Sequence, residues 1–152
     1  MSEEEKKEPT VKKEVTALEL ALLCEQIAYD RKGENIIRLD MTGLSSESDH
    51  YIICTGFSEP HIGAITERIK RDVRTQLGIR PIVVDGTPAS HWMIIDYGSV
   101  MVHVLTEDAR RKYDLEGLWG DAPRVDAIAR LDAEAKKRFE KKTMVEKKPS
   151  KK

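Results

Sequence analysis

Asp96 and His103 are the pair of side chains whose types and spacing come nearest to known chemistry. They stand seven residues apart on either side of Gly98 and Ser99, and a carboxylate that orients an imidazole is a common arrangement in general acid–base catalysis. A catalytic pair needs a third group to accept or deliver the reacting atoms, and the sequence offers none nearby. A cross-strand hydrogen bond that fixes a surface is the simpler interpretation, with a catalytic pair as the alternative.

Asp114 and Glu116 have the acidic-x-acidic spacing that can bind a divalent metal ion. Such carboxylates act in phosphoryl transfer when a glycine-rich phosphate loop accompanies them, and the sequence contains no Walker-type, Gly-x-Gly-x-x-Gly or Gly-x-Ser-x-Gly motif. Cys24 and Cys54 lie far apart without metal-ligand spacing, so we expect reduced thiols. We therefore predict no catalytic residue, cofactor or metal site.

The stretch from 91 to 105 must position Asp96 and His103. Two runs of β-branched and large apolar residues flank Gly98-Ser99, which is a strong signal for a β-hairpin. The predicted register places Trp92 opposite Leu105, Ile94 opposite His103, and Asp96 opposite Met101.

Because side chains alternate between faces, this hairpin has two distinct surfaces. One is wholly apolar and is expected to be core: Met93, Ile95, Tyr97, Val100, Val102 and Val104. The other mixes aromatic, charged and aliphatic residues, as partner-binding surfaces do: Trp92, Ile94, Asp96, Met101, His103 and Leu105.

The remaining chain predicts alternating helices and strands. Thr16 and Glu19 form a capping-box pattern for a helix over 17–31. A second helix follows Ser58 and carries apolar residues at intervals of 3 or 4, with Arg68, Lys70, Arg71 and Arg74 at other positions. Further strands are predicted at 35–39, 50–55 and 79–84, a short helix at 106–113 and a helical pattern at 125–139. The order predicts a layered α/β sandwich with a mixed sheet of about five strands.

Charge divides the 152-residue chain into two parts. Residues 1–123 hold 15 Lys and Arg against 22 Asp and Glu, whereas residues 124–152 hold 11 against 5. A basic extension of this kind either contacts nucleic acid weakly or serves as a solvated tail. The sequence lacks a transmembrane run and a signal-peptide pattern, so no membrane partner and a cytoplasmic location are expected.

The loop at 113–123 is unusually apolar. Tyr113, Leu115, Leu118 and Trp119 can fold back as a lid on the core, or they can anchor a partner, since aromatic residues dominate binding hot spots. The two interpretations are compatible.

Four stretches in order resemble the Iojap-related ribosomal silencing factor family, RsfS. The matching pieces are Asp40 with Ser45-Ser46, Asp49 to Gly56, Trp92 to Gly98 with Val102-His103-Val104, and Tyr113 to Trp119. The resemblance covers roughly residues 14–123, between a disordered lead-in at 1–13 and the basic helical to disordered tail at 124–152.

This resemblance implies a non-enzymatic translation repressor that binds ribosomal protein number fourteen of the large subunit and sterically blocks joining of the small subunit. It also implies a nucleotidyltransferase-like fold without the catalytic carboxylates, and homodimers away from the ribosome. The family's partner surface falls here on Trp92, Asp96, Met101, His103, Tyr113, Leu115, Leu118 and Trp119. A nucleotide-binding module and a large-subunit assembly factor remain as alternatives.

Overall fold

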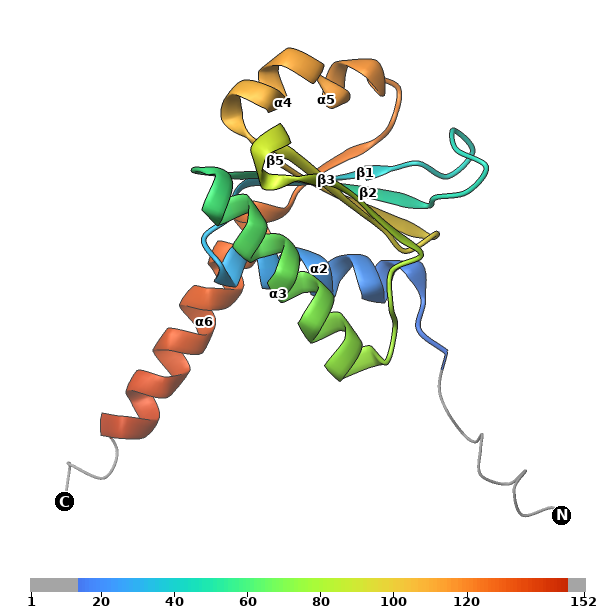
Figure 1. Cartoon of the computed structure of the whole chain (residues 1–152). Helices are drawn as coiled ribbons and strands as arrows, with labels where there is room; N and C mark the ends of the chain where they lie inside the picture. The colour runs from blue at the N-terminus through green and yellow to red at the C-terminus, as the bar shows by residue number, and fades with distance from the viewer. Residues whose placement is uncertain (1–13, 148–152) are drawn as a thin grey trace, which may run out of the picture.

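One mixed sheet with helices on both faces makes up the described part of the chain, residues 14–147 of a computed structural model (Figure 1). The helices are α2 (Ala17–Asp30), α3 (Glu59–Leu77), η1 (Pro88–Ser90), α4 (Glu107–Tyr113), α5 (Leu115–Leu118) and α6 (Ala127–Lys147). The strands are β1 (Glu34–Asp40), β2 (His50–Gly56), β3 (Val83–Thr87), β4 (Trp92–Asp96), β5 (Val100–Thr106) and β6 (Arg124–Asp126).

The strand order across the sheet is β3-β4-β5-β2-β1-β6. Strands β2 and β5 pair in parallel, and the other neighbouring strands pair antiparallel. The predicted α/β sandwich is thus confirmed, with six strands in place of about five.

The first face of the sheet carries the main core, beneath α2 and α3 (Figure 1). Helix α2 begins with the predicted capping box between Thr16 and Glu19. Helix α3 begins at the Ser58 cap and buries a stripe that includes Ile65, Ile69 and Val73 against the sheet. The capping and the apolar spacing that define these helices are both local, so the sequence could specify them directly.

The β4–β5 hairpin has the predicted register. Trp92 pairs with Leu105, Ile94 with His103, and Asp96 with Met101. The face predicted to be core lies in the main core, with every member buried: Met93, Ile95, Tyr97, Val100, Val102 and Val104.

The folded unit continues past the predicted boundary at residue 123. Strand β6 pairs with β1, and Ala127 and Leu131 at the start of α6 are buried in the main core. Glu25, fully buried in α2, holds α6 to the body through an ion pair with Arg130 of 2.7 Å. A strand of three residues has too few positions to show alternation, so the sequence predicted a helical pattern there and missed the sixth strand.

The third strand was predicted too early. It covers Val83–Thr87 rather than 79–84, because Pro81 has no amide hydrogen and pairing with β4 starts only where Ile82 donates to the carbonyl of Asp96. β3 is an edge strand whose residues are all exposed. Residues 1–13, predicted to be a disordered lead-in, lie outside the described part of the chain. Within 14–147 no helix is both long enough and apolar enough to cross a membrane.

Candidate functional site

The second face of the sheet is only partly covered. Helices α4 and α5 lie over β5, β2 and β1, where a smaller core forms around Ile53, Leu105 and Leu115. Figure 1 shows these two helices on the side of the sheet opposite α2 and α3. Beside them, rings from three strands, α4 and the C-cap of α5 gather on the half-open surface, which we call the aromatic face: Tyr51, Trp92, His103, Tyr113 and Trp119.

These rings form one continuous chain of contacts. The ring centroids of Trp92 and Tyr113 are 4.6 Å apart, and those of Trp92 and His103 are 6.0 Å apart. Tyr51 lies 5.0 Å from His103 on one side and 5.9 Å from Trp119 on the other, edge to face. Aromatic pairs at these separations stabilise one another, so the surface is held in a fixed shape.

The buried ring of His103 packs under the Tyr51 and Trp92 rings of the aromatic face. It is 3% exposed, and its Nδ1 accepts a hydrogen bond of 3.2 Å from the indole Nε1 of Trp92. Burial lowers the pKa of His103 to about 4, so the imidazole is neutral at pH 7 and can accept this bond. The predicted hydrogen bond between His103 and Asp96 is wrong: Asp96 Oδ1 instead accepts from the amide of Gly98 at 2.8 Å, in the hairpin turn.

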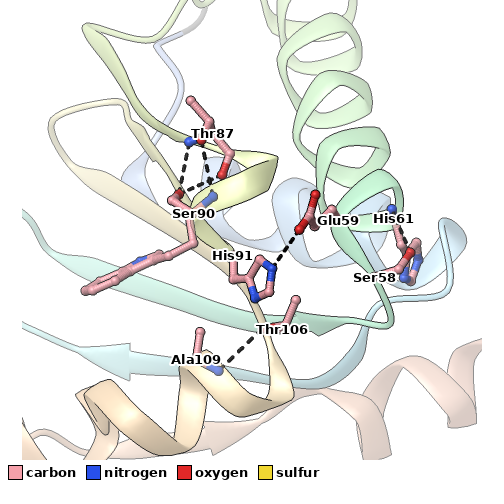
Figure 2. A network of polar contacts seen from close by, with 9 residues as sticks. Ser58, Glu59, His61, Thr87, Ser90, His91, Thr106 and Ala109 are labelled. Carbon is pink, nitrogen blue, oxygen red and sulfur yellow. Dashed lines mark hydrogen bonds and ion pairs between the residues drawn. The ribbon is translucent and has the colours of Figure 1, made fainter.

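A polar network positions the start of β4, and with it Trp92 (Figure 2). Ser90 Oγ donates to the carbonyl oxygen of Trp92 at 3.0 Å, and the amide of Thr106 donates to the carbonyl of His91. His91 adopts a left-handed backbone, and its Nε2 lies 2.8 Å from a carboxylate oxygen of Glu59 on α3. Hydrogen bonds from η1 and β5 thereby hold the backbone of His91 and Trp92.

Gly86 allows β3 to approach Trp92 closely. Its φ is +87°, and a Cβ at this position would lie 2.1 Å from the carbonyl oxygen of Trp92. Only glycine meets both conditions without strain.

The segment after α4 divides its apolar side chains between core and solvent. Leu115 is 8% exposed and lies in the smaller core, whereas Leu118 is 69% exposed and Tyr113 is 44% exposed. Leu115 therefore packs as the predicted lid on the core, and the role of the exposed side chains as partner anchors stays a prediction.

Asp114 and Glu116, the acidic pair with metal-binding spacing, make hydrogen bonds that stabilise the fold. Asp114 caps α5 by accepting from the amide of Gly117, and Glu116 accepts from Nε and Nη2 of buried Arg110 at 3.0 and 2.8 Å. The same guanidinium donates to the carbonyl of Asn35 and to Thr55 Oγ1. Among residues 14–147 no group of three His, Cys, Asp or Glu side chains could hold a metal ion.

Arg110 also lines a cleft of about 1050 Å³ between the 33–35 segment and helices α4 and α5. Its guanidinium donates four hydrogen bonds to protein oxygens out of five N–H donors, so it holds α4 and α5 onto the sheet and has little capacity left for a nucleotide.

The predicted partner-binding residues therefore fall into two groups. His103 and Leu115 are buried and support the surface from within. The others reach solvent at least in part: Trp92, Asp96, Met101, Tyr113, Leu118 and Trp119.

Sequence reasoning missed two contributors to this side of the molecule. Tyr51 joins it because the parallel pairing of β2 with β5 sets it beside Met101. Val83 joins the same face from edge strand β3, opposite Asp96. For Tyr51 the missing signal was pairing between strands 50 residues apart, which a single sequence does not show. For Val83 it was the pairing of β3 with β4, which the prediction of the third strand at 79–84 did not give.

Fold and surface together define a class: an α/β sandwich protein with one sheet face packed by helices and a second face half open and lined with rings. Such a surface is better suited to binding another macromolecule than to catalysis on a small-molecule substrate.

Comparison with known proteins identifies the family. Residues 14–152 match the family model described as ribosomal silencing factor during starvation. The chain is 40% identical over 108 residues to the ribosomal silencing factor RsfS of Halalkalibacterium halodurans, covering 71% of this chain and 92% of the relative. The chain belongs to the ribosomal silencing factor family.

A solved structure and a more distant relative extend the comparison. A crystal structure of a Chromobacterium violaceum protein superposes with a TM-score of 0.66 at 30% identity, over 69% of this chain and 87% of that one. A mouse protein named mitochondrial assembly of ribosomal large subunit protein 1 is 29% identical over 89 residues, 57% of this chain and 39% of the relative.

Proposed function

We propose that this protein binds the large ribosomal subunit through its aromatic face, at ribosomal protein number fourteen, and lowers translation by sterically blocking the small subunit. The observation that carries the proposal is the half-open aromatic face, with exposed Leu118 next to Trp119 in the sequence, in a chain of the silencing factor family. The protein acts by occupying a surface, without catalysis, in the cytoplasm where ribosomes work.

The composition of this surface favours a protein partner. Half-buried Trp92 and exposed Tyr113 are the kinds of residue that dominate binding hot spots. Asp96 and Asp85 add negative charge on the same face, since Asp85 pairs with Ile94 on the neighbouring strand. Ribosomal proteins are typically basic, so acids here provide complementary charge that orients the encounter.

A role in large-subunit assembly is a second candidate, favoured by the name of the mouse relative. It would use the same surface and differ in the time at which the protein binds. A nucleotide-binding role is less well supported, because the arginine in the cleft beside α4 is engaged by Asn35, Thr55 and Glu116.

Sucrose-gradient sedimentation of purified ribosomal subunits tests the proposal. The wild-type protein should migrate with the large subunit and reduce the joined-ribosome peak. Leu118→Asp should abolish both effects without harming the fold, because Leu118 is 69% exposed. Phe139→Asp on α6 is the matched control, since Phe139 is 70% exposed and α6 lies on the side of the sheet opposite α4 and α5 (Figure 1).

The outcomes separate the readings. Co-migration with no effect on joining would favour the assembly role over silencing. Absence of the wild-type protein from the large-subunit fraction, or equal behaviour of the two variants, would contradict the proposed surface.

The same face also supports homodimers away from the ribosome, because exposed apolar side chains tend to associate. Sedimentation equilibrium should show a dimer that Leu118→Asp weakens and Phe139→Asp does not. A wild-type monomer at high concentration would contradict this part of the proposal.

A further inference from the structure

A groove of about 900 Å³ lies along the solvent-facing side of α3, on the side of the sheet opposite the aromatic face. In the described part of the chain its lining includes Ala64, Thr75 and Pro81 and one carboxylate, Glu67. Six cationic side chains dominate it, and we call this surface the basic groove: Arg31, Arg68, Lys70, Arg71, Arg74 and Arg80.

The positive charge of the basic groove is only partly neutralised. Lys70 pairs with Glu67 at 3.1 Å, and Asp72 lies 3.3 Å from Arg68 and 3.5 Å from Arg71. Two carboxylates thus face six cations. The excess charge is concentrated in a body whose residues 1–123 are acidic overall.

Three of the cations have no such partner. Within the described residues 14–147, neither Arg31, Arg74 nor Arg80 makes an ion pair, and all three are exposed. They come from the end of α2, the last turns of α3 and the segment before β3. Folding therefore brings Arg31 and Arg80, which lie outside α3 in the sequence, next to the cationic side chains of α3.

The shape of the basic groove suits a linear array of negative charges. Its lining on α3 extends from Ala64 to Thr75, which is about 16 Å of helix at the usual rise. Arginine guanidiniums bind phosphate oxygens in a bidentate manner. Among residues 14–147, no aromatic side chain lines the groove to stack on an unpaired base, which is how single strands are usually held.

We propose that the basic groove binds the phosphate backbone of an RNA duplex. This inference rests on the proposed function, since a protein on the large ribosomal subunit is surrounded by folded RNA. The groove lies on α3, which packs on the first face of the sheet, and the aromatic face lies on the second. One molecule can therefore contact a ribosomal protein and an RNA helix at the same time.

The test measures binding of the full-length protein to a fluorescent RNA hairpin with a 16-base-pair stem of arbitrary sequence, by anisotropy over a series of KCl concentrations. We expect binding that weakens steeply with salt. Arg74→Glu with Arg80→Glu should lower the affinity at least tenfold and reduce the slope of log affinity against log salt by about two, one for each lost phosphate contact. Neither side chain makes an ion pair within residues 14–147, so the fold should be unaffected.

Lys136→Glu with Lys137→Glu is the matched control, with the same charge change on α6. If this variant loses RNA binding and the groove variant keeps it, the basic tail is the RNA contact and the proposal is overturned. Failure of the wild-type protein to bind the duplex at 50 mM KCl overturns it too, as does tighter binding to an unstructured RNA of equal length.

Failure of the groove and failure of the proposed function are distinguishable. The groove variant should still bind isolated ribosomal protein number fourteen, whereas Leu118→Asp should lose that binding and retain duplex RNA. If Leu118→Asp keeps the ribosomal protein and the groove variant loses RNA, the groove stands and the aromatic-face assignment falls.

Discussion

Replacing Trp92 with alanine should separate its proposed role as a partner anchor from its contact with His103. Its indole contacts Tyr113 and donates a hydrogen bond to His103. Truncating a fully buried tryptophan typically costs about 3–5 kcal/mol of folding free energy. Because Trp92 is only half-buried, we expect a loss of about 2 kcal/mol, which corresponds to a melting temperature about 4–8 °C lower in a chain of this size.

If the proposed binding to ribosomal protein number fourteen uses this face, the same substitution should weaken it by about 2 kcal/mol or more, or roughly thirtyfold in Kd, as expected for an aromatic hot spot. Removing the indole also exposes His103 to water, so the pKa of His103 should rise from about 4 toward its ordinary value. The assays are isothermal titration with the purified ribosomal protein, thermal melts by circular dichroism, and NMR titration of the histidines.

Phe57→Ala is the control, because Phe57 is an exposed aromatic that stacks on His61 away from this surface. It should leave the affinity unchanged. If Trp92→Ala binds as tightly as the wild type, Trp92 is not an anchor. If the variant loses its folded circular dichroism signal, the side chain belongs to the core, and the half-open character of this face has been misread.

Two further substitutions test the faces of the hairpin. Val102→Asp places a charge in the fully buried main core and should abolish the cooperative melt, whereas Met101→Asp, one residue away on the open face, should still fold; the opposite result would mean that the two faces are exchanged in solution. The pKa of His103 in the folded state lies below its unfolded value, so the unfolded chain takes up the proton first. The free energy of unfolding of the wild type should therefore fall by up to about 3 kcal/mol as the pH drops from about 6.5 to 4. His103→Gln should show a smaller fall over the same pH range. Urea unfolding at pH 7, 5.5 and 4.5 measures the difference, and parallel curves for the two proteins would contradict the assigned burial.

Local sequence signals were sufficient for much of the fold. The capping box at Thr16, the cap at Ser58 and the glycine-containing turn at Gly98 each depend on a few neighbouring residues. The alternation of apolar residues around that turn then fixed both faces of the hairpin, because a slip of one residue would expose the whole core set.

The sequence was less informative wherever strands from distant positions meet. The pairing of β2 with β5 brings Tyr51 into the aromatic face, and a three-residue β6 widens the sheet. The burial of His103 likewise follows from rings that pack above it from other elements. The basic groove was hidden for the same reason, since Arg31 and Arg80 meet α3 only after folding.

The parallel pairing at the centre of the sheet has a consequence for synthesis of the chain. β2 pairs with β5 from His50 with Val100 to Gly56 with Thr106, so each pair joins residues 50 positions apart. While the chain grows from its N-terminus, β1 and β2 can form a hairpin early, yet the other edge of β2 has no strand to pair with until residue 106 has been added. Contacts of such long range slow folding and leave apolar strands open to aggregation.

We therefore expect a ribosome-stalled nascent chain that exposes residues 1–98 to be cleaved readily by protease and to recruit chaperones, and one that exposes residues 1–147 to resist both. Protection of the shorter chain would show that α2, β1 and β2 fold without their central partner. The central pairing of the sheet can therefore form only after the ribosome has synthesised β5, more than two thirds of the chain.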